Sequence, residues 1–305
     1  MLCPLSILPV EPENMHNALQ ELIELLALEP IEQNIFRGQS QNLGWGTVFG
    51  GQVLGQALSA AEQTVGVDHS VHSLHGYFLR LGDVDRPIVY DVDCIRDGRS
   101  FTTRRVVAIQ KGRAIFNMSA SFQRPEDGFE HQAEMPQTVG PEDLLSEREL
   151  IQQRIDELPE MLRKRANAKR PIEIRPVNPH NPMKPDVRAP ARLVWIRAAD
   201  RLPDDTSIHQ YLLAYASDFH LLVTALMPHG VSWLTPGMQV ASVDHAMWFH
   251  RPFRMDDWLL YVMESPSASN ARGLARGQFF TRDGVLVAST AQEGLMRKWP
   301  DAKKA

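Results

Sequence analysis

The chain has 305 residues, 43% of them hydrophobic, which is enough to fill the cores of one or two domains of ordinary size. Its 32 basic and 37 acidic side chains give a formal net charge of −5, which argues against nucleic acid as a partner. The two cysteines, Cys3 and Cys94, are too few for a disulfide framework, and no apolar run reaches the roughly 18 residues of a membrane span. We therefore expect a soluble protein of a reducing cytoplasm, without a membrane partner.

The first part of the chain predicts an amphipathic helix on the outside of a domain. Residues 15–28 carry apolar side chains at helical spacing, at Leu19, Leu22, Ile23 and Leu26. Pro30 then ends the pattern. Residues 1–14 precede this helix and lack the positive start of a signal peptide, so we expect them to be a disordered tail.

A second helix and a run of antiparallel strands follow in the first half. A strand through residues 31–37 and a glycine-rich loop lead to a helix that begins at Gly50 and Gly51, and its small residues allow a sheet to wrap closely around it. Asp97-Gly98 and Gly112 are typical of hairpin turns. The predicted strands are residues 71–80, 87–96, 101–111 and 114–123.

Residues 125–190 predict a long connector, because they hold 10 of the 21 prolines together with many charges. Within the connector, Leu144–Leu158 carries apolar residues at helical spacing, so a short helix is expected before Pro159. The second half then predicts a strand at residues 192–197 and a helix at residues 209–226. The strands expected after this helix are residues 240–252, 258–265, 271–281 and 285–294, with a hairpin turn at Asp283-Gly284.

The two halves repeat each other. Ser70–Phe78 aligns with Ser242–His250, and the turn Lys111-Gly112 aligns with Asp283-Gly284, in both cases 172 positions later. A helix wrapped by a curved antiparallel sheet is the hot-dog architecture, and two fused copies make a double hot-dog of the α+β class with one continuous sheet. The predicted parts are the tail at residues 1–14, an N-terminal hot-dog at 15–124, the connector at 125–190 and a C-terminal hot-dog at 191–299.

Four separated motifs resemble the acyl-CoA thioesterase II family, in the order of that family and from about Met15 to Arg297. They are Phe49-Gly-Gly-Gln-Val-Leu-Gly-Gln-Ala57, Tyr215-Ala-Ser-Asp-Phe219, Val243-Asp-His-Ala-Met-Trp-Phe-His-Arg-Pro-Phe253 and Ala288-Ser-Thr-Ala-Gln-Glu-Gly294. The resemblance implies an enzyme that hydrolyses acyl-CoA to a free fatty acid and coenzyme A. It implies no cofactor, and it implies a homodimer or homotetramer.

The resemblance also implies three catalytic residues, which are Asp218, Ser242 and Gln292. Ser242 stands where the family usually has threonine, so the hydroxyl is kept while the rotamer is held less firmly. The residue types suit thioester hydrolysis, because a carboxylate can accept a proton from water while a hydroxyl and a carboxamide fix the position of that water. No covalent intermediate is required. Aligning the copies sets Gly50, Ser70 and Ala120 opposite these three residues, so we expect one active site per chain.

Five further residues are expected to contact the substrate. Backbone N–H groups of Gly50 and Gly51, at a helix start, could polarise the thioester oxygen. His75 could reach the pocket from the first copy. Arg272 and Arg276 could meet the phosphates of coenzyme A, or they could be solvated arginines beside an ordinary polar turn.

Other chemistries have less support in the sequence. His69, His72 and His75 do not converge on a metal, since an offset of three on a strand points side chains to opposite faces. A nucleophile elbow, a Walker loop and a dinucleotide fingerprint are absent. A hydratase that adds water to an enoyl-CoA, and a module that binds acyl-CoA without turnover, are the two alternatives to a thioesterase. The hydratases pair an Asp with a His, which neither predicted helix shows at the expected motif.

Overall fold

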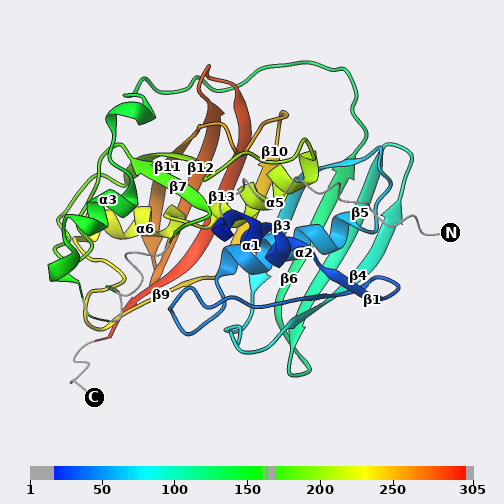
Figure 1. The fold of residues 1–305 in the computed structure, drawn as a ribbon, viewed down its shortest axis with the longest axis horizontal. Coiled ribbons are helices and arrows are strands. Elements are labelled where there is room, and N and C mark those ends of the chain that lie inside the picture. Colours follow the sequence, from blue (N-terminus) through cyan, green and yellow to red (C-terminus); the bar gives the residue numbers. More distant parts are fainter. Residues whose placement is uncertain (1–16, 159, 161–162, 164–168, 300–305) are drawn as a thin grey trace.

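The computed structural model describes residues 17–158, 160, 163 and 169–299, so the predicted tail at residues 1–14 lies outside the described residues. Within them, the strands form one large antiparallel sheet that curves around two central helices (Figure 1). No helix in this part of the chain is long and apolar enough to cross a lipid bilayer.

The first half contains two helices and six strands. These are α1 (Asn17–Leu26), β1 (Glu29–Glu32), β2 (Ile35–Gly38), α2 (Gly50–Glu62), β3 (Ser70–Phe78), β4 (Ile88–Asp97), β5 (Phe101–Gln110) and β6 (Arg113–Gln123). The amphipathic pattern of α1 is confirmed, because Leu19, Leu22 and Leu26 are buried. The strand expected at residues 31–37 is instead the hairpin of β1 and β2, which turns where Asn34 adopts a left-handed φ of 61°.

The connector and the second half contain the remaining elements. In the connector lie two short 3₁₀ helices, Pro141–Asp143 and Ile155–Glu157, on either side of α3 (Glu147–Gln152). The second half comprises β7 (Ile172–Pro176), β8 (Ala191–Ala198), α5 (Thr206–Ser217), α6 (Leu221–Leu226), a 3₁₀ turn (Met227–His229), β9 (Met238–Ser242), β10 (Asp244–Phe249), β11 (Leu259–Ser269), β12 (Arg272–Thr281) and β13 (Leu286–Lys298).

The order of the strands shows the internal repeat directly. From edge to edge the sheet runs β1-β2-β4-β5-β6-β3-β10-β13-β12-β11-β8-β7, so each half has the same order and the halves join where β3 pairs with β10. In this order β7 is the counterpart of β1. Residues 172–176 therefore belong to the sheet, although the sequence predicted them to be part of the connector at 125–190. The strand is only five residues long, follows one proline and ends in another, so its sequence resembles a loop.

The helix expected at residues 209–226 is two helices with a break between them. The α5 helix ends with Asp218 as its C-cap, and His220 then adopts a left-handed φ of 67° before α6 begins. A left-handed residue cannot continue a right-handed helix, so the chain changes direction here. Asp218 is therefore at the end of a helix and not near the middle of one.

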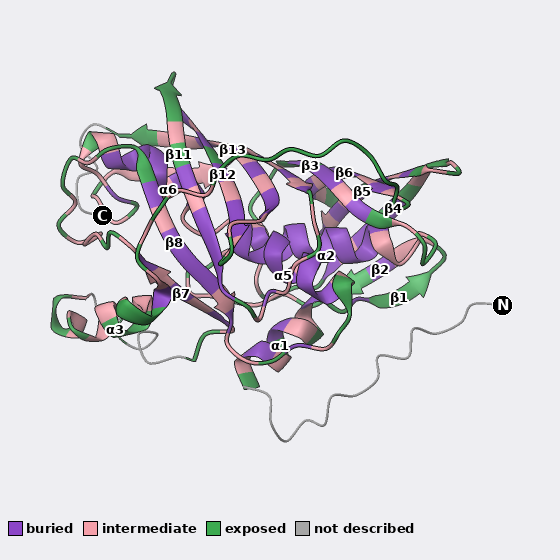
Figure 2. Ribbon diagram, turned by 90° about the horizontal axis from the view of Figure 1, so that it is seen from above, coloured by how far each residue is buried: buried purple, intermediate pink, exposed green. Residues whose placement is uncertain are grey.

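The central helices α2 and α5 pack against each other on the concave side of the sheet, and both are buried along most of their length (Figure 2). Their close contact requires glycine. A Cβ on Gly51 would lie 2.2 Å from the backbone oxygen of Tyr215, and one on Gly55 would lie 3.1 Å from that of Tyr211. The small residues that the sequence offered as a surface for a sheet thus serve first to let two helices approach.

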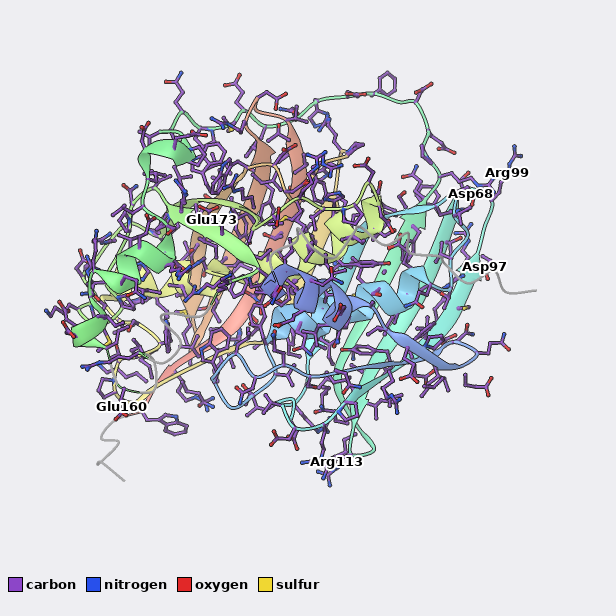
Figure 3. All side chains as sticks on the ribbon, in the orientation of Figure 1. Asp68, Asp97, Arg99, Arg113, Glu160 and Glu173 are labelled. Carbon is purple, nitrogen blue, oxygen red and sulfur yellow. The ribbon has the colours of Figure 1, made fainter. Side chains whose placement is uncertain are left out.

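The connector covers the outer face of the second half of the sheet. Trp195 donates its indole N–H to the backbone oxygen of Val139 at 2.9 Å, and the guanidinium of Arg197 lies 4.4 Å from the ring of Trp258. Charged side chains such as Asp97, Arg99 and Arg113 instead point outward from the hairpin ends of the first half (Figure 3). Through the contact with Trp195, the connector covers the outer face of the second half at β8.

We expect Gly51→Ala to lower the free energy of unfolding by about 1–3 kcal/mol, because the new methyl group meets a backbone oxygen that cannot move alone. Chemical unfolding of the two proteins measures this difference. Gly128→Ala is the matched control, since a Cβ on Gly128 meets no atom within 4 Å. Equal stability of the two variants would contradict the close approach of α2 and α5.

Candidate active site

The structure brings Asp218, Ser242 and Gln292 into one hydrogen-bonded group. The amide nitrogen of Gln292 donates to Oδ1 of Asp218 at 2.6 Å and to Oγ of Ser242 at 3.0 Å. The hydroxyl of Ser242 donates to the same carboxylate oxygen at a longer distance of 3.4 Å. These three residues are called the trio below.

Each member of the trio comes from a different element of the second half. Asp218 caps α5, Ser242 is the last residue of β9, and Gln292 lies on β13, whose buried residues alternate and put this amide on the inner face. Ser242 pairs with Gly294, two residues beyond Gln292, so β9 and β13 hold the hydroxyl and the amide in fixed register. The break after α5 then brings the carboxylate down onto both.

The carboxylate of Asp218 keeps one oxygen free of the trio. The hydrogen bonds that Gln292 and Ser242 donate to Asp218 are both accepted by Oδ1, whereas Oδ2 points towards the start of α2. A Cβ on Gly50 would lie 2.7 Å from Oδ2 and 3.1 Å from the ring of Phe78. Gly50 and Gly51 are thus at the site, as expected, and the absence of a side chain leaves room beside the carboxylate.

Aromatic rings from both halves form one wall of the site. Phe49, just before α2, stacks on Phe219 with ring centroids 4.6 Å apart, and its ring edge meets Tyr215 at 5.2 Å. Trp45 joins the far side of Phe49 at 5.6 Å and is half exposed. Burial raises the pKa of the Tyr215 hydroxyl far above its ordinary value, so this ring stays neutral. An apolar wall reaches from the surface to the trio.

A buried histidine that is not among the predicted site residues lies beside the trio. His245 is 1% exposed, and its Nε2 lies 3.0 Å from Oγ of Ser217, the residue before Asp218. Burial lowers the pKa of His245 to about 4, although the charge of Asp218 acts in the opposite direction. The sequence carries a signal for this burial. His245 is two residues before the apolar Met247 on one strand, so both side chains lie on the same face.

Three predicted contact residues lie away from the trio. His75 is exposed on β3, where its ring meets Trp248 edge-on at 5.2 Å on the outer face, because strand alternation turns its neighbours Leu74 and Gly76 inward. Arg272 pairs with Glu293 at 2.9 Å, and Arg276 pairs with Glu264 at 3.3 Å. Both arginines are exposed on the face of β12 opposite its buried residues, and their contact with the phosphates of coenzyme A stays a prediction.

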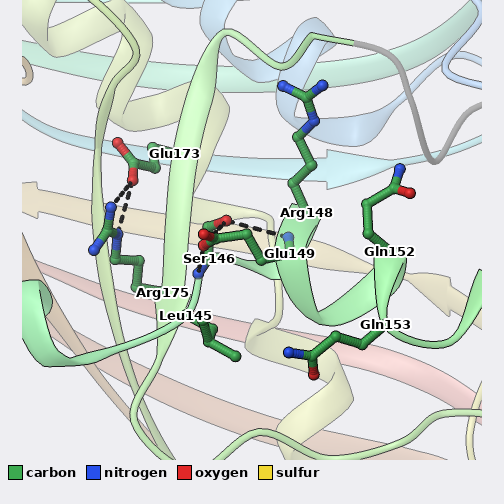
Figure 4. Close-up of a pocket in the computed structure, with 8 residues that line it drawn as sticks. All are labelled: Leu145, Ser146, Arg148, Glu149, Gln152, Gln153, Glu173 and Arg175. Carbon is green, nitrogen blue, oxygen red and sulfur yellow. Dashed lines mark hydrogen bonds and ion pairs between the residues drawn. The ribbon is translucent and has the colours of Figure 1, made fainter.

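A pocket of about 580 Å³ lies elsewhere, between α3 and β7 (Figure 4). Its walls include the capping box of Ser146 and Glu149 and the ion pair of Arg175 with Glu173. None of the trio lines it. Among the described residues, no three His, Cys, Asp or Glu side chains gather where they could hold a metal ion.

Comparisons with known proteins identify the family and the fold. The family model for acyl-CoA thioesterase matches residues 161–295, and the model for the acyl-CoA thioesterase N-terminal domain matches residues 40–123. Acyl-CoA thioesterase 2 of Haemophilus influenzae is 48% identical over 93% of this chain and 99% of its own length. Human acyl-coenzyme A thioesterase 8 is 41% identical over 92% of this chain and 90% of its own.

Solved structures give the same picture. The acyl-CoA thioesterase II TesB2 of Mycobacterium marinum is 42% identical and has a TM-score of 0.73, with 91% of this chain and 98% of that one covered. A hot-dog protein of unknown function from Alicyclobacillus acidocaldarius, only 19% identical, has a TM-score of 0.74 over 92% of this chain and 99% of its own, and so confirms the fold. The chain is a double hot-dog protein of the α+β class, and it belongs to the acyl-CoA thioesterase family.

Proposed function

We propose that this chain hydrolyses acyl-CoA to a free fatty acid and coenzyme A by direct attack of a water molecule activated by Asp218. Membership of the family makes the chain an acyl-CoA hydrolase, which favours this reaction over the hydratase and the binding module. One observation supports the trio as its centre. Gln292 and Ser242 both bond to Oδ1 of Asp218, which leaves Oδ2 free to accept a proton.

In the proposed reaction, Oδ2 of Asp218 is the general base. It takes a proton from water while the water oxygen bonds to the thioester carbon, and the carbon–sulfur bond then breaks as Asp218 returns the proton to the departing sulfur. Gln292 and Ser242 hold the carboxylate in one orientation, which removes the entropic cost of aligning it. The base, the water and the thioester carbon thus meet in a fixed geometry.

The start of α2 is the proposed site of the negative charge that develops on the thioester oxygen. The first N–H groups of a helix lack partners within the helix, and its dipole is positive at this end. Gly50 and Gly51 supply these groups beside Oδ2 of Asp218, and the lack of side chains lets an acyl group come close. A substrate carbonyl would therefore lie between the carboxylate of one half and the helix start of the other.

The trio supports hydrolysis without a covalent intermediate. Ser242 accepts a hydrogen bond from Gln292, and its own hydroxyl lies 3.4 Å from Asp218, which is long for a hydroxyl that must lose its proton to become a nucleophile. A histidine base is not bonded to it, since His245 bonds to Ser217. The oligomeric state and the location of the protein are separate predictions. We propose that the protein forms a homodimer or homotetramer and that it acts in the cytoplasm.

Asp218→Asn is expected to lower kcat by about 10²–10⁴-fold, because an amide cannot accept the proton of water at neutral pH. Release of free thiol from several acyl-CoAs, followed with a thiol-reactive dye, measures this loss. Asp283→Asn, in the hairpin turn between β12 and β13, is the control and should hydrolyse at the wild-type rate. Undiminished turnover by Asp218→Asn would remove this carboxylate from the mechanism.

Ser242→Ala should keep measurable activity, because the serine positions the carboxylate and forms no bond to the acyl group. We expect a loss of about tenfold in kcat, which is the effect of one hydrogen bond. Ser242→Thr keeps the hydroxyl and should stay within about threefold of wild type. Complete inactivity of Ser242→Ala, together with a burst of thiol in the wild type, would show that serine is acylated.

Gln292→Glu should move the acidic limb of the pH–rate profile upward by more than about one pH unit. The new carboxyl group would lie where the amide is now, 2.6 Å from Oδ1 of Asp218, and two such groups resist double ionisation. The upper of the two pKa values of this carboxyl pair therefore rises, so the two groups share one proton over a wider range and the free carboxylate of Asp218 is fully formed only at higher pH. A profile that keeps its midpoint while falling in height would contradict the contact.

A further inference from the structure

His245 lies on the inner face of β10, and its ring is placed by the residue next to Asp218. The ring nitrogen Nε2 is 3.0 Å from Oγ of Ser217, and that same hydroxyl donates to the backbone oxygen of Ala214 at 2.8 Å. A serine hydroxyl has one hydrogen, so Nε2 must be the donor in the bond between His245 and Ser217. Nε2 therefore carries a hydrogen. Because burial lowers the pKa of His245 to about 4, the ring is neutral at neutral pH and Nδ1 carries a lone pair.

That lone pair has no partner. Nδ1 of His245 is buried and accepts no hydrogen bond from any described residue. A buried acceptor without a donor destabilises the folded state, and ordered water commonly satisfies such atoms in proteins. Nδ1 of His245 can therefore accept a hydrogen bond from a water molecule.

A second unpartnered acceptor belongs to Gln292. Its two amide hydrogens are already given to Asp218 and Ser242, and its oxygen Oε1 is buried without a partner among the described residues. Ala246 of β10 pairs with Ala291 of β13, so His245 and Gln292 follow as the next residues of two adjoining strands. Both are fully buried on the inner face, just beyond the last pair of this ladder, so the two side chains are neighbours.

Two neighbouring acceptors and no donor match the hydrogen-bonding capacity of one water molecule. We propose that a buried water donates one hydrogen to Nδ1 of His245 and the other to Oε1 of Gln292, and that His245 thereby fixes the orientation of the Gln292 amide. The inference rests on the proposed function of the trio. With its oxygen held by this water, the amide presents its N–H groups to Asp218 and Ser242. A turned amide would set an oxygen against the carboxylate and lose both bonds.

His245 is thus a positioning residue that acts through Gln292 and does not touch the substrate. Ser217 is part of the same device, because it sets the tautomer of the ring and precedes the catalytic carboxylate in the chain. The proposed hydrogen bonds connect β10 with the end of α5 through Ser217 and with β13 through Gln292. The position of Asp218 is then fixed by β10, α5 and β13 together.

Two substitutions separate the two sides of the ring. In His245→Asn the amide oxygen can take the place of Nδ1, which keeps the acceptor for water and loses the bond to Ser217. In His245→Gln the longer side chain can reach Ser217 in place of Nε2 and loses the acceptor. We expect His245→Asn to keep kcat within about threefold of wild type and His245→Gln to lose about tenfold, with KM changed less than about twofold in both.

The tautomer gives an independent measurement. In protein labelled with ¹⁵N-histidine, the signal that disappears in His245→Asn should show Nε2 protonated and Nδ1 unprotonated at neutral pH. Equal kcat values for the two variants, or a hydrogen on Nδ1, would overturn the proposal. A failure of the trio itself would look different, because Asp218→Asn would then remain active and the two His245 variants would have equal kcat values, while the tautomer of His245 would still be the expected one.

Discussion

A carboxylate oxygen of Asp218 lies where a side chain on Gly50 would have to be, and the site depends on this close approach. It is possible because β3 and β10 join the halves into one sheet, which sets α2 and α5 against each other on the same concave face. Gly51 lets the helices meet, and Gly50 leaves a space beside the carboxylate. The carboxylate of Asp218 and the start of α2 that faces it thus come from different halves.

The two halves have the same strand order, but only the second has polar groups at the inner positions of the trio. Ala120 on β6 is buried at the position that corresponds to Gln292 on β13. Counted from the hairpin glycines Gly112 and Gly284, Phe122 corresponds to Gly294, and these residues pair with Val71 and Ser242. Val71 is therefore the counterpart of Ser242, in place of the Ser70 that the alignment set there, and the first half is apolar at this point.

Much of the fold could be predicted from the sequence, because alternation and hairpin turns are local signals. The strands from β3 to β6 and the turn at Gly284 lie close to where these signals put them. The break at Asp218 could not be predicted, since apolar residues continue on both sides of it and only tertiary packing holds His220 left-handed. The strand β7 was hidden in the same way, because its prolines resemble those of a loop until β8 pairs with it.

The trio was found through its motifs, whereas the residues that hold it depend on packing that no motif states. Asp218 and Gln292 are 74 positions apart, and the register of β13 alone decides that the amide faces inward. His75 shows the converse. Alternation was applied to the three histidines against a metal site, but the same rule, applied to the apolar Leu74 beside His75, already turns His75 to the outer face.

The connector has a role at the active site that its composition does not suggest. Glu147, at the start of α3, lies with Oε1 3.1 Å from Nε2 of His220 and with Oε2 3.0 Å from Arg170. Burial alone would raise the pKa of Glu147, but its contact with His220 and the guanidinium groups of Arg170 and Arg192 hold it well below its ordinary value. A carboxylate whose pKa is lowered in the folded state adds stability above its unfolded pKa and loses it as the pH falls. His220 is the left-handed residue that ends the break after Asp218. The connector therefore anchors, through the carboxylate of Glu147, the turn that places Asp218.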